Sequence, residues 1–169
     1  WTQSLPVRIS PTLASDTQWS ASVVLPTNTA NINADDICSI ISYGGNRIGV
    51  LWSGQSVNAY RFSFHVDGAA DTVWSAVENA TTGETDDHLN MKAHSDGRVF
   101  VAGKNAANNL LLLVRAVNGT WSRFVITQPT RIPTRPIVML NEPANLIQVF
   151  ATGQDTGEVF EKTSPISAI

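Results

Sequence analysis

Asp71–Gly103 reads DTVWSAVENATTGETDDHLNMKAHSDGRVFVAG, and this stretch contains every feature that decides the fold. It begins with a Trp-Ser segment at 71–76 and continues through a polar connection to the aspartate pair Asp86–Asp87. It ends with two short apolar segments that meet at Ser95–Gly97. Each of these features recurs elsewhere in the chain at a spacing near fifty residues. Self-similarity at a fixed period is the sequence signature of a repeat architecture.

The Trp-Ser segment occurs three times. The sequence DTQWSA at 16–21 matches DTVWSA at 71–76 at five of its six positions, and NGTWS at 118–122 is a looser copy. The three tryptophans lie 55 and 47 residues apart: Trp19, Trp74 and Trp121. We expect them to occupy equivalent positions in the fold, each mostly buried against its own repeat unit.

The aspartate pair has the same period. Asp35–Asp36 precedes Asp86–Asp87 by 51 residues, and Thr134–Pro136 takes the corresponding place 47 residues later. We interpret Asp36 and Asp87 as structural positions, because an aspartate at the start of a strand can accept backbone N–H bonds and order the turn before it. The alternative interpretation is a pair of acid–base carboxylates. The period divides the chain into the end of one unit, two complete units and the start of another: 1–35, 36–86, 87–133 and 134–169.

The segments between turn signals are short and rich in Val, Ile, Phe, Leu and Thr, which is typical of strands. No segment has a helical period, and three prolines in 129–136 exclude a helix there. The chain is therefore predicted to be all-β. The run LLLLVRAV at 110–117 lacks polar alternation in its first half, as expected of a strand covered on both faces. The predicted strands are 5–10, 19–25, 37–43, 47–52, 59–66, 73–78, 88–93, 98–102, 110–117, 121–127, 136–140, 146–151 and 158–162.

Four-stranded units of this length, each beginning after a polar connection, are the pattern of β-propeller blades. In that geometry the first strand of each unit lines a central channel. We predict a β-propeller segment of about three four-stranded antiparallel blades within a ring of roughly six to eight. The further blades would come from a longer chain or from an oligomer. A β-sandwich is the alternative all-β fold, but it predicts no self-similarity at this period.

Two turns resemble a known motif. The segments Asp67–Ser75 and Asn118–Ser122 look like degenerate Asp-box turns, which occur between the third and fourth strands in sialidase-like propellers. The sequence from Asp35 to Ile166 is similar to uncharacterised secreted bacterial propeller proteins of this kind. The resemblance implies the fold and not an activity, because the box is a structural turn. The chain departs from the motif at Asp71 and Thr72, where the box usually has glycine and threonine.

Composition excludes several classes of protein. With 43% hydrophobic and 15% charged residues the chain is globular, and a net charge of −3 without a basic run argues against nucleic acid as a partner. No apolar run reaches 18 residues, so no membrane-spanning helix is predicted. The scarcity of Lys beside abundant Ser, Thr and Asn suits an extracellular protein. Cys38 lies in the apolar run 37–41, and we expect it to be buried as a small hydrophobic residue.

The sequence supports no catalytic assignment. Sialidases hold a carboxylate with three arginines, and Arg131–Pro133 resembles a triplet near the start of such domains, but here it lies in a late connection. Only Tyr43 and Tyr60 are available as tyrosines, and neither is near a glutamate in the repeat frame. The aspartate pairs could offer oxygens to Ca²⁺, although no spaced Asp-x-Asp-x-Asp loop supports this, and no other cofactor is expected.

Three residues are the predicted ligand contacts. His88 and Arg135 occupy equivalent positions of the repeat, at the start of consecutive first strands. Lys92 lies four residues after His88, on the same strand face. Cationic groups converging on a channel would suit an anionic glycan, such as a sugar acid or a sulfate. The alternative is that Lys92 and Arg135 pair with neighbouring aspartates. We therefore expect a secreted carbohydrate-binding or adhesive module. The alternative function is a glycoside hydrolase or polysaccharide lyase whose catalytic residues lie mostly outside this segment.

Overall fold

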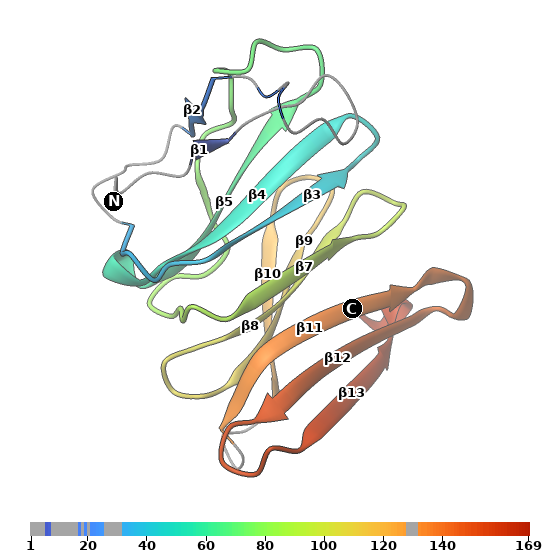
Figure 1. Ribbon diagram of the computed structural model, residues 1–169. Helices are drawn as coiled ribbons and strands as arrows, with labels where there is room; N and C mark the ends of the chain where they lie inside the picture. Colours follow the sequence, from blue (N-terminus) through green and yellow to red (C-terminus); the bar gives the residue numbers. More distant parts are fainter. Residues whose placement is uncertain (1–5, 8–16, 18, 20, 26–31, 128–131) are drawn as a thin grey trace.

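The computed structural model describes residues 6–7, 17, 19, 21–25, 32–127 and 132–169 (Figure 1). Within these ranges the protein is all-β: its only helical elements are three-residue 3₁₀ turns, and it contains no α-helix. These turns are η2 (Gln55–Val57), η3 (Glu142–Ala144) and η4 (Ile166–Ala168). The predicted fold class is confirmed at this level.

Three antiparallel sheets follow one another along the chain (Figure 1). In each sheet every strand pairs with the next in sequence. The first sheet comprises β3 (Cys38–Tyr43), β4 (Arg47–Gly54), β5 (Ala59–Val66) and β6 (Glu78–Asn79). The second comprises β7 (Leu89–Ala93), β8 (Val99–Lys104), β9 (Leu110–Arg115) and β10 (Trp121–Thr127). The third comprises β11 (Pro133–Asn141), β12 (Leu146–Gly153) and β13 (Val159–Pro165). A small separate ribbon pairs β1 (Pro6–Val7) with β2 (Val23–Val24).

Glycines make the tight turns between the first two strands of the first and second sheets. Gly44 and Gly45 follow β3 with φ of +59° and +82°, and Gly97 precedes β8 with φ of +96°. Only glycine adopts such angles without a steric penalty, which is why these positions interrupt otherwise β-branched segments. The turns set the hairpin register, so that Tyr43 pairs with Arg47 across the first of them.

The first and second sheets pack face to face. Tyr43, Leu51 and Phe62 from the first sheet meet Met91 and Leu113 from the second in one buried cluster. The opposite face of the second sheet packs against the third in another cluster, formed by residues of β8, β9, β11 and β12. The first strands of successive sheets also lie side by side, β3 against β7 and β7 against β11. Each sheet is thus a layer, and the three layers share two apolar interfaces.

Burial along β9 confirms one prediction and exposure at Cys38 contradicts another. Every residue of β9 is buried, because both faces of the second sheet are covered. Cys38 is exposed, although it was expected to be buried. The reason is strand alternation, because successive side chains of β3 point to opposite faces of the sheet. Cys38 lies on the same face as Ile40, which is 60% exposed, whereas Tyr43 lies on the opposite face and is buried.

One strand prediction needs correction, and the three strands predicted over 136–162 are confirmed. The expected strand 73–78 is reduced to the two residues of β6, although the segment before it still donates from Ser75 N–H to Phe64 O. The third sheet has three strands among the residues that the structure describes. The predicted strands 5–10 and 19–25 fall largely outside the described residues, apart from β1 and β2.

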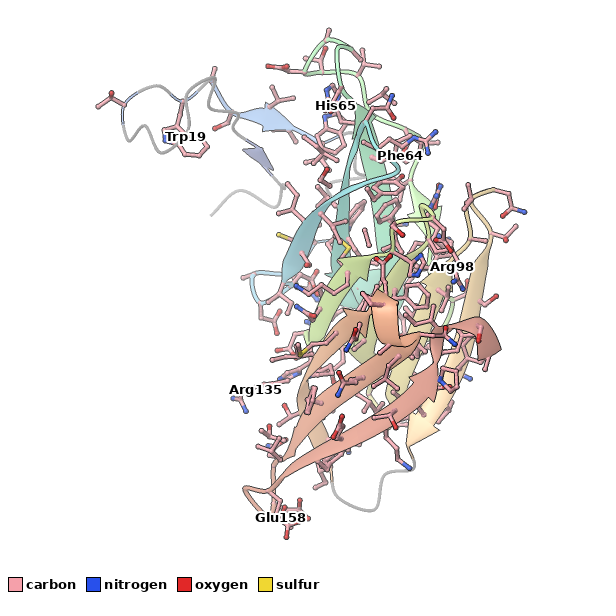
Figure 2. The ribbon with its side chains drawn as sticks, turned by 90° about the vertical axis from the view of Figure 1, so that its right-hand side faces the viewer. Trp19, Phe64, His65, Arg98, Arg135 and Glu158 are labelled. Atoms are coloured by element: carbon pink, nitrogen blue, oxygen red, sulfur yellow. The ribbon has the colours of Figure 1, made fainter. Side chains whose placement is uncertain are left out.

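The three tryptophans do not share one environment. Trp19 is 50% exposed and lies away from the sheets in Figure 2, which contradicts its expected burial. Trp74 lies in the turn before β6, where its indole N–H donates to Asp71 O and its ring stacks beside His65. Trp121 begins β10 and packs against Phe62 of the preceding sheet. The shared Trp-Ser pattern therefore does not predict a common core site.

The face-to-face packing makes a stability prediction. Phe62 is fully buried between the first two sheets, so Phe62→Ala should lower the free energy of unfolding by about 3–5 kcal/mol. Phe124→Ala is the matched control, since Phe124 is 41% exposed and its truncation should cost about 1 kcal/mol or less. Urea unfolding of both variants measures the difference. Equal losses would contradict this packing arrangement.

Candidate functional site

The three predicted ligand contacts have different surroundings in the structure. Arg135 is exposed at a bulge in β11, with φ of +50°, and in Figure 2 it projects away from the strands. Lys92 is exposed on β7. His88 instead turns toward Asp86 and Asp87. No ion pair formed by the described part of the chain includes Lys92 or Arg135, so the expected alternative, pairing with neighbouring aspartates, does not occur there.

The group that does come together is Asp86, Asp87 and His88, at the connection between the first and second sheets. His88 Nδ1 lies 2.7 Å from Asp86 Oδ1 and 2.5 Å from Asp87 Oδ1. Its other ring nitrogen, Nε2, lies 2.9 Å from Thr134 Oγ1 on β11. The imidazole thus links the connection before β7 to the first strand of the third sheet. We call Asp86, Asp87 and His88 the Asp-Asp-His group.

Tyr60 anchors this group from the first sheet. Its hydroxyl oxygen lies 2.9 Å from His88 O and 2.5 Å from Lys104 O, and it accepts from Lys104 N–H at 3.2 Å. Gly103 makes this possible, because a Cβ there would come within 3.1 Å of the Tyr60 ring. Burial raises the pKa of Tyr60, so the phenol stays neutral and keeps its donor. Three sheets therefore meet at one hydrogen-bonded junction.

The pKa values of the two aspartates in the group are shifted in opposite directions. Burial alone would raise the pKa of Asp86, but hydrogen bonds with Asp87 and His88 and the nearby charge of Lys104 outweigh burial and lower it. The hydrogen bond to Asp86, together with burial, raises the pKa of Asp87. Lys104 Nζ lies 3.6 Å from Asp86 Oδ2. Asp86 is therefore the carboxylate that stays ionised and Asp87 the one that more readily holds a proton.

The donor set could also be considered for a metal. The three side chains each offer one atom, and these atoms lie within 4.8 Å of one another. Ca²⁺ takes roughly six to eight oxygen ligands, and two carboxylates with an imidazole do not fit that requirement. The donors are already bonded to one another and to Lys104. The geometry thus favours acid–base coupling over Ca²⁺ binding.

The corresponding aspartate of the preceding repeat behaves differently. Asp36 accepts from the backbone N–H groups of Asn33 at 2.7 Å and Gln55 at 3.3 Å, and from Ser53 Oγ at 3.1 Å. These bonds order the turn before β3, which is the structural role proposed for this position from sequence. Asp87 instead contacts His88 and Asp86. The repeat preserves the position of the aspartate and not its partners.

Sequence reasoning missed the other members of the junction. Tyr60 lies on β5, Lys104 at the end of β8 and Thr134 at the start of β11, and only the fold brings them together. The one available signal was that Thr134 follows Asp87 at the repeat spacing of 47 residues. Arg131, which resembled part of a sialidase triplet, lies outside the described residues.

The junction predicts the effect of removing one hydroxyl. Tyr60→Phe removes the hydroxyl's bonds to His88 O and Lys104 O, whereas Lys104 N–H keeps its bond to His88 O, so the change should cost about 1 kcal/mol of stability. Tyr43→Phe is the matched control, because the buried Tyr43 hydroxyl has no hydrogen-bond partner among the described residues and its loss should be near neutral. Thermal or urea unfolding compares the two. A Tyr60→Phe variant as stable as Tyr43→Phe would contradict the junction.

The opposite pKa shifts predict opposite effects of charge removal at pH 7. The lowered pKa of Asp86 means that its ionised form stabilises the fold above the unfolded value of about 3.9, and this stability is lost as pH falls through the folded pKa. Asp86→Asn should therefore destabilise at pH 7. The raised pKa of Asp87 means that its ionisation opposes folding, so Asp87→Asn should stabilise at pH 7.

Both differences should shrink when unfolding is measured near pH 3, where each carboxyl is largely protonated in the unfolded chain. Urea titrations of the two variants and the wild type at pH 3, 5 and 7 provide the test. The same sign of effect at pH 7 for both variants would show that the pair does not titrate as assigned.

No protein-family model matches the chain, and no curated protein matches it. None of the helical elements in the described residues has the length and apolar character needed to span a membrane.

Proposed function

We propose that the three sheets are consecutive blades of a larger β-propeller, and that the protein is an extracellular binding module for anionic glycans. The proposal for the fold rests on strand order and neighbours. Each sheet is built in sequence order from its first strand outward, and the first strands β3, β7 and β11 lie side by side. This is the arrangement in which first strands surround a channel. The Asp-box-like turns at Gly68 and Gly119 fall between the third and fourth strands, as the resemblance implies.

The observation that carries the binding role is a pair of unpartnered cations. Lys92 on β7 and Arg135 on β11 are exposed, on neighbouring first strands, with no carboxylate partner among the described residues. A guanidinium binds a carboxylate or sulfate through two parallel N–H bonds, and an ammonium adds a second positive charge. In a protein of net charge −3 such free cations mark a local preference for anions. A uronic acid or a sulfated sugar fits that preference.

A glycoside hydrolase is the second candidate, and the Asp-Asp-His group is the observation that favours it. Two carboxyls with diverging pKa values are the pattern of an acid–base pair. However, glycosidase carboxyls stand roughly 5–5.5 Å apart in retaining enzymes and 6.5–9.5 Å in inverting ones. Asp86 and Asp87 both contact the same His88 Nδ1, and their nearest oxygens lie within 4.8 Å of each other, closer than either catalytic separation. A binding module therefore accounts better for the geometry.

Titration calorimetry with a sulfated or uronic-acid oligosaccharide, and with a neutral glucan of equal length, tests the binding role. We expect binding of the acidic sugar only, weakened by salt, and weakened roughly three- to tenfold by Lys92→Ala or Arg135→Ala. Lys162→Ala is the control, because Lys162 is exposed on β13 and not on a first strand. Equal affinity for both sugars, or indifference to both first-strand variants, would overturn the assignment. Release of reducing sugar from the ligand would support the hydrolase instead.

A further inference from the structure

The turn between β3 and β4 contains a cation without a counter-ion. Arg47 is half-buried at the start of β4, and its guanidinium carbon lies 5.4 Å from the centre of the Phe64 ring and 5.9 Å from that of the Tyr43 ring. It takes part in no ion pair formed by the described residues, and its buried Nε has no hydrogen-bond partner among them. Glu78, whose charge also acts on Tyr43, is already bonded to Arg115. Buried charges in proteins are normally paired, so this position calls for an anion.

Tyr43 adds a second unpartnered group. It is 3% exposed, and its buried hydroxyl has no hydrogen-bond partner among the described residues. Burial raises the pKa of Tyr43, so the phenol keeps its proton and can donate. Arg47 Nε–H is a donor as well. Two donors on adjoining side chains thus lack an acceptor, whereas buried polar groups are nearly always hydrogen-bonded.

The equivalent turn of the second sheet shows what such a position requires. His94 and Arg98 follow Tyr43 and Arg47 by 51 residues, which is also the spacing of the aspartate pairs, and they flank the turn between β7 and β8. There Asp96 accepts from Arg98 Nε at 2.8 Å and lies 3.0 Å from His94 Nδ1. The cation and the ring of that turn therefore share one carboxylate.

The first turn of the third sheet provides a second carboxylate. Glu142 of η3 lies 3.6 Å from His94 Nε2 and accepts from Ser95 N–H at 2.9 Å. The turn between β7 and β8 lies in the same way against the turn between β3 and β4, since a Cβ on Gly97 would come within 3.9 Å of Gly44. Ser95 is the residue at the corresponding place, 47 residues before Glu142, and it offers no carboxylate.

The turn between β3 and β4 therefore lacks both carboxylates of its counterpart. Gly45 stands where the repeat has Asp96, because the two are 51 residues apart. Apart from its chain neighbours, no atom lies within 4 Å of the position that a Cβ on Gly45 would take. The space that an acidic side chain would enter at this turn is thus open.

We propose that Arg47 and Tyr43 bind the carboxylate of a small molecule, which takes toward Arg47 the part that Asp96 takes toward Arg98. Both groups that serve the equivalent turn are carboxylates, and a guanidinium matches a carboxylate through two parallel N–H bonds. The Phe64 ring supports the guanidinium from below, so the cation is already positioned before the ligand arrives.

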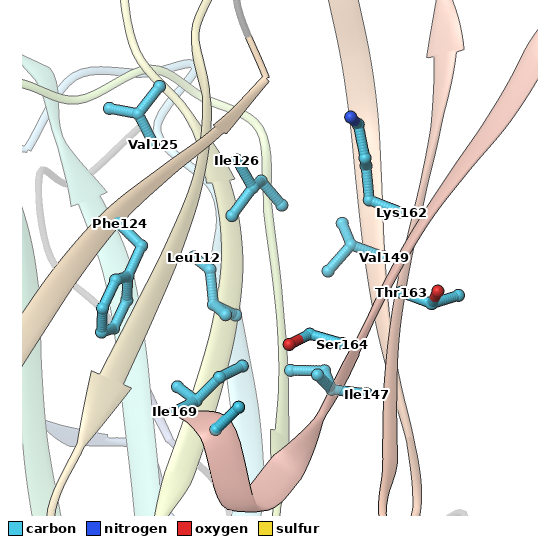
Figure 3. A pocket seen from close by; sticks show the side chains of 11 residues that line it. Leu112, Phe124, Val125, Ile126, Ile147, Val149, Lys162, Thr163, Ser164 and Ile169 are labelled. Atoms are coloured by element: carbon cyan, nitrogen blue, oxygen red, sulfur yellow. The ribbon is translucent and has the colours of Figure 1, made fainter.

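The inference is independent of the glycan proposal, since it involves other residues. In Figure 2 Phe64 and Arg98 lie on one side of the molecule, and Arg135 projects from the other. The site is also distinct from the hollow between the second and third sheets, which is lined by aliphatic side chains such as Leu112 and Ile147 (Figure 3).

Sodium acetate is the probe, added to the full chain with nitrogen-15-labelled arginines while sodium chloride keeps the ionic strength constant. The Nε–Hε resonance of Arg47 reports the site directly. We expect it to shift saturably, with half-saturation on the order of 10 mM. Arg98 is the internal control, because its Nε and Nη1 already donate to Asp96 and to Ile169 O, and its resonance should not shift. Acetamide, which has the same shape without the charge, should leave Arg47 unchanged.

Two matched variants complete the test, with the ring protons of Phe64 as the reporter of acetate binding. Arg47→Gln should weaken acetate at least tenfold, while Arg98→Gln at the equivalent position of the second sheet leaves its affinity unchanged. If Arg47→Gln misfolds, the comparison of acetate with acetamide on the wild-type chain still decides the matter. The proposal is overturned if the Arg47 resonance does not shift, if acetamide shifts it equally, if Arg98 responds as Arg47 does, or if Arg47→Gln binds acetate as wild type does.

Discussion

Each four-stranded sheet in this chain has two apolar faces, and the need to cover both of them organises the molecule. The second sheet shows the constraint most clearly, because one face packs against Phe62 and its neighbours and the other against Val138 and its neighbours. The first sheet is covered by the second on one face and by Leu25 and Ile32 on the other. Burial of this kind contributes about 25 cal/mol to the free energy of unfolding for each Å² of apolar surface. Summed over the buried side chains, this is far more than the exposed ion pairs contribute.

The same stacking creates the polar junction. Once β3, β7 and β11 lie side by side, the connections that precede them are brought together, and Tyr60, His88 and Thr134 bond in series across three sheets. Buried polar groups must find partners, and these three supply one another's. The junction therefore accounts structurally for the coupling of the two carboxylates.

Periodicity and alternation predicted the all-β class and most strands, since β5 spans the expected residues and β10 does as well. These features are local, so a sequence displays them. The burial of Trp19 and of Cys38 was predicted wrongly. Burial depends on which sheet lies opposite a side chain, and neither the Trp-Ser repeat nor a short apolar run shows that. His88 and Arg135 occupy equivalent places in the repeat, but His88 contacts Asp86, Asp87 and Thr134, whereas Arg135 is exposed at a bulge. Propeller closure and ligand identity stay predictions.

The central claim is that successive sheets are separate layers packed face to face. Proton–proton Overhauser spectroscopy of the labelled protein tests it most directly, because the rings of Phe62 and Trp121 lie on different sheets with centroids 5.6 Å apart. The account predicts strong cross-peaks between these two rings, with backbone cross-strand peaks within each sheet and none joining β6 to β7. Absence of the Phe62–Trp121 peaks, or backbone peaks that pair β6 with β7 in one continuous sheet, would contradict it.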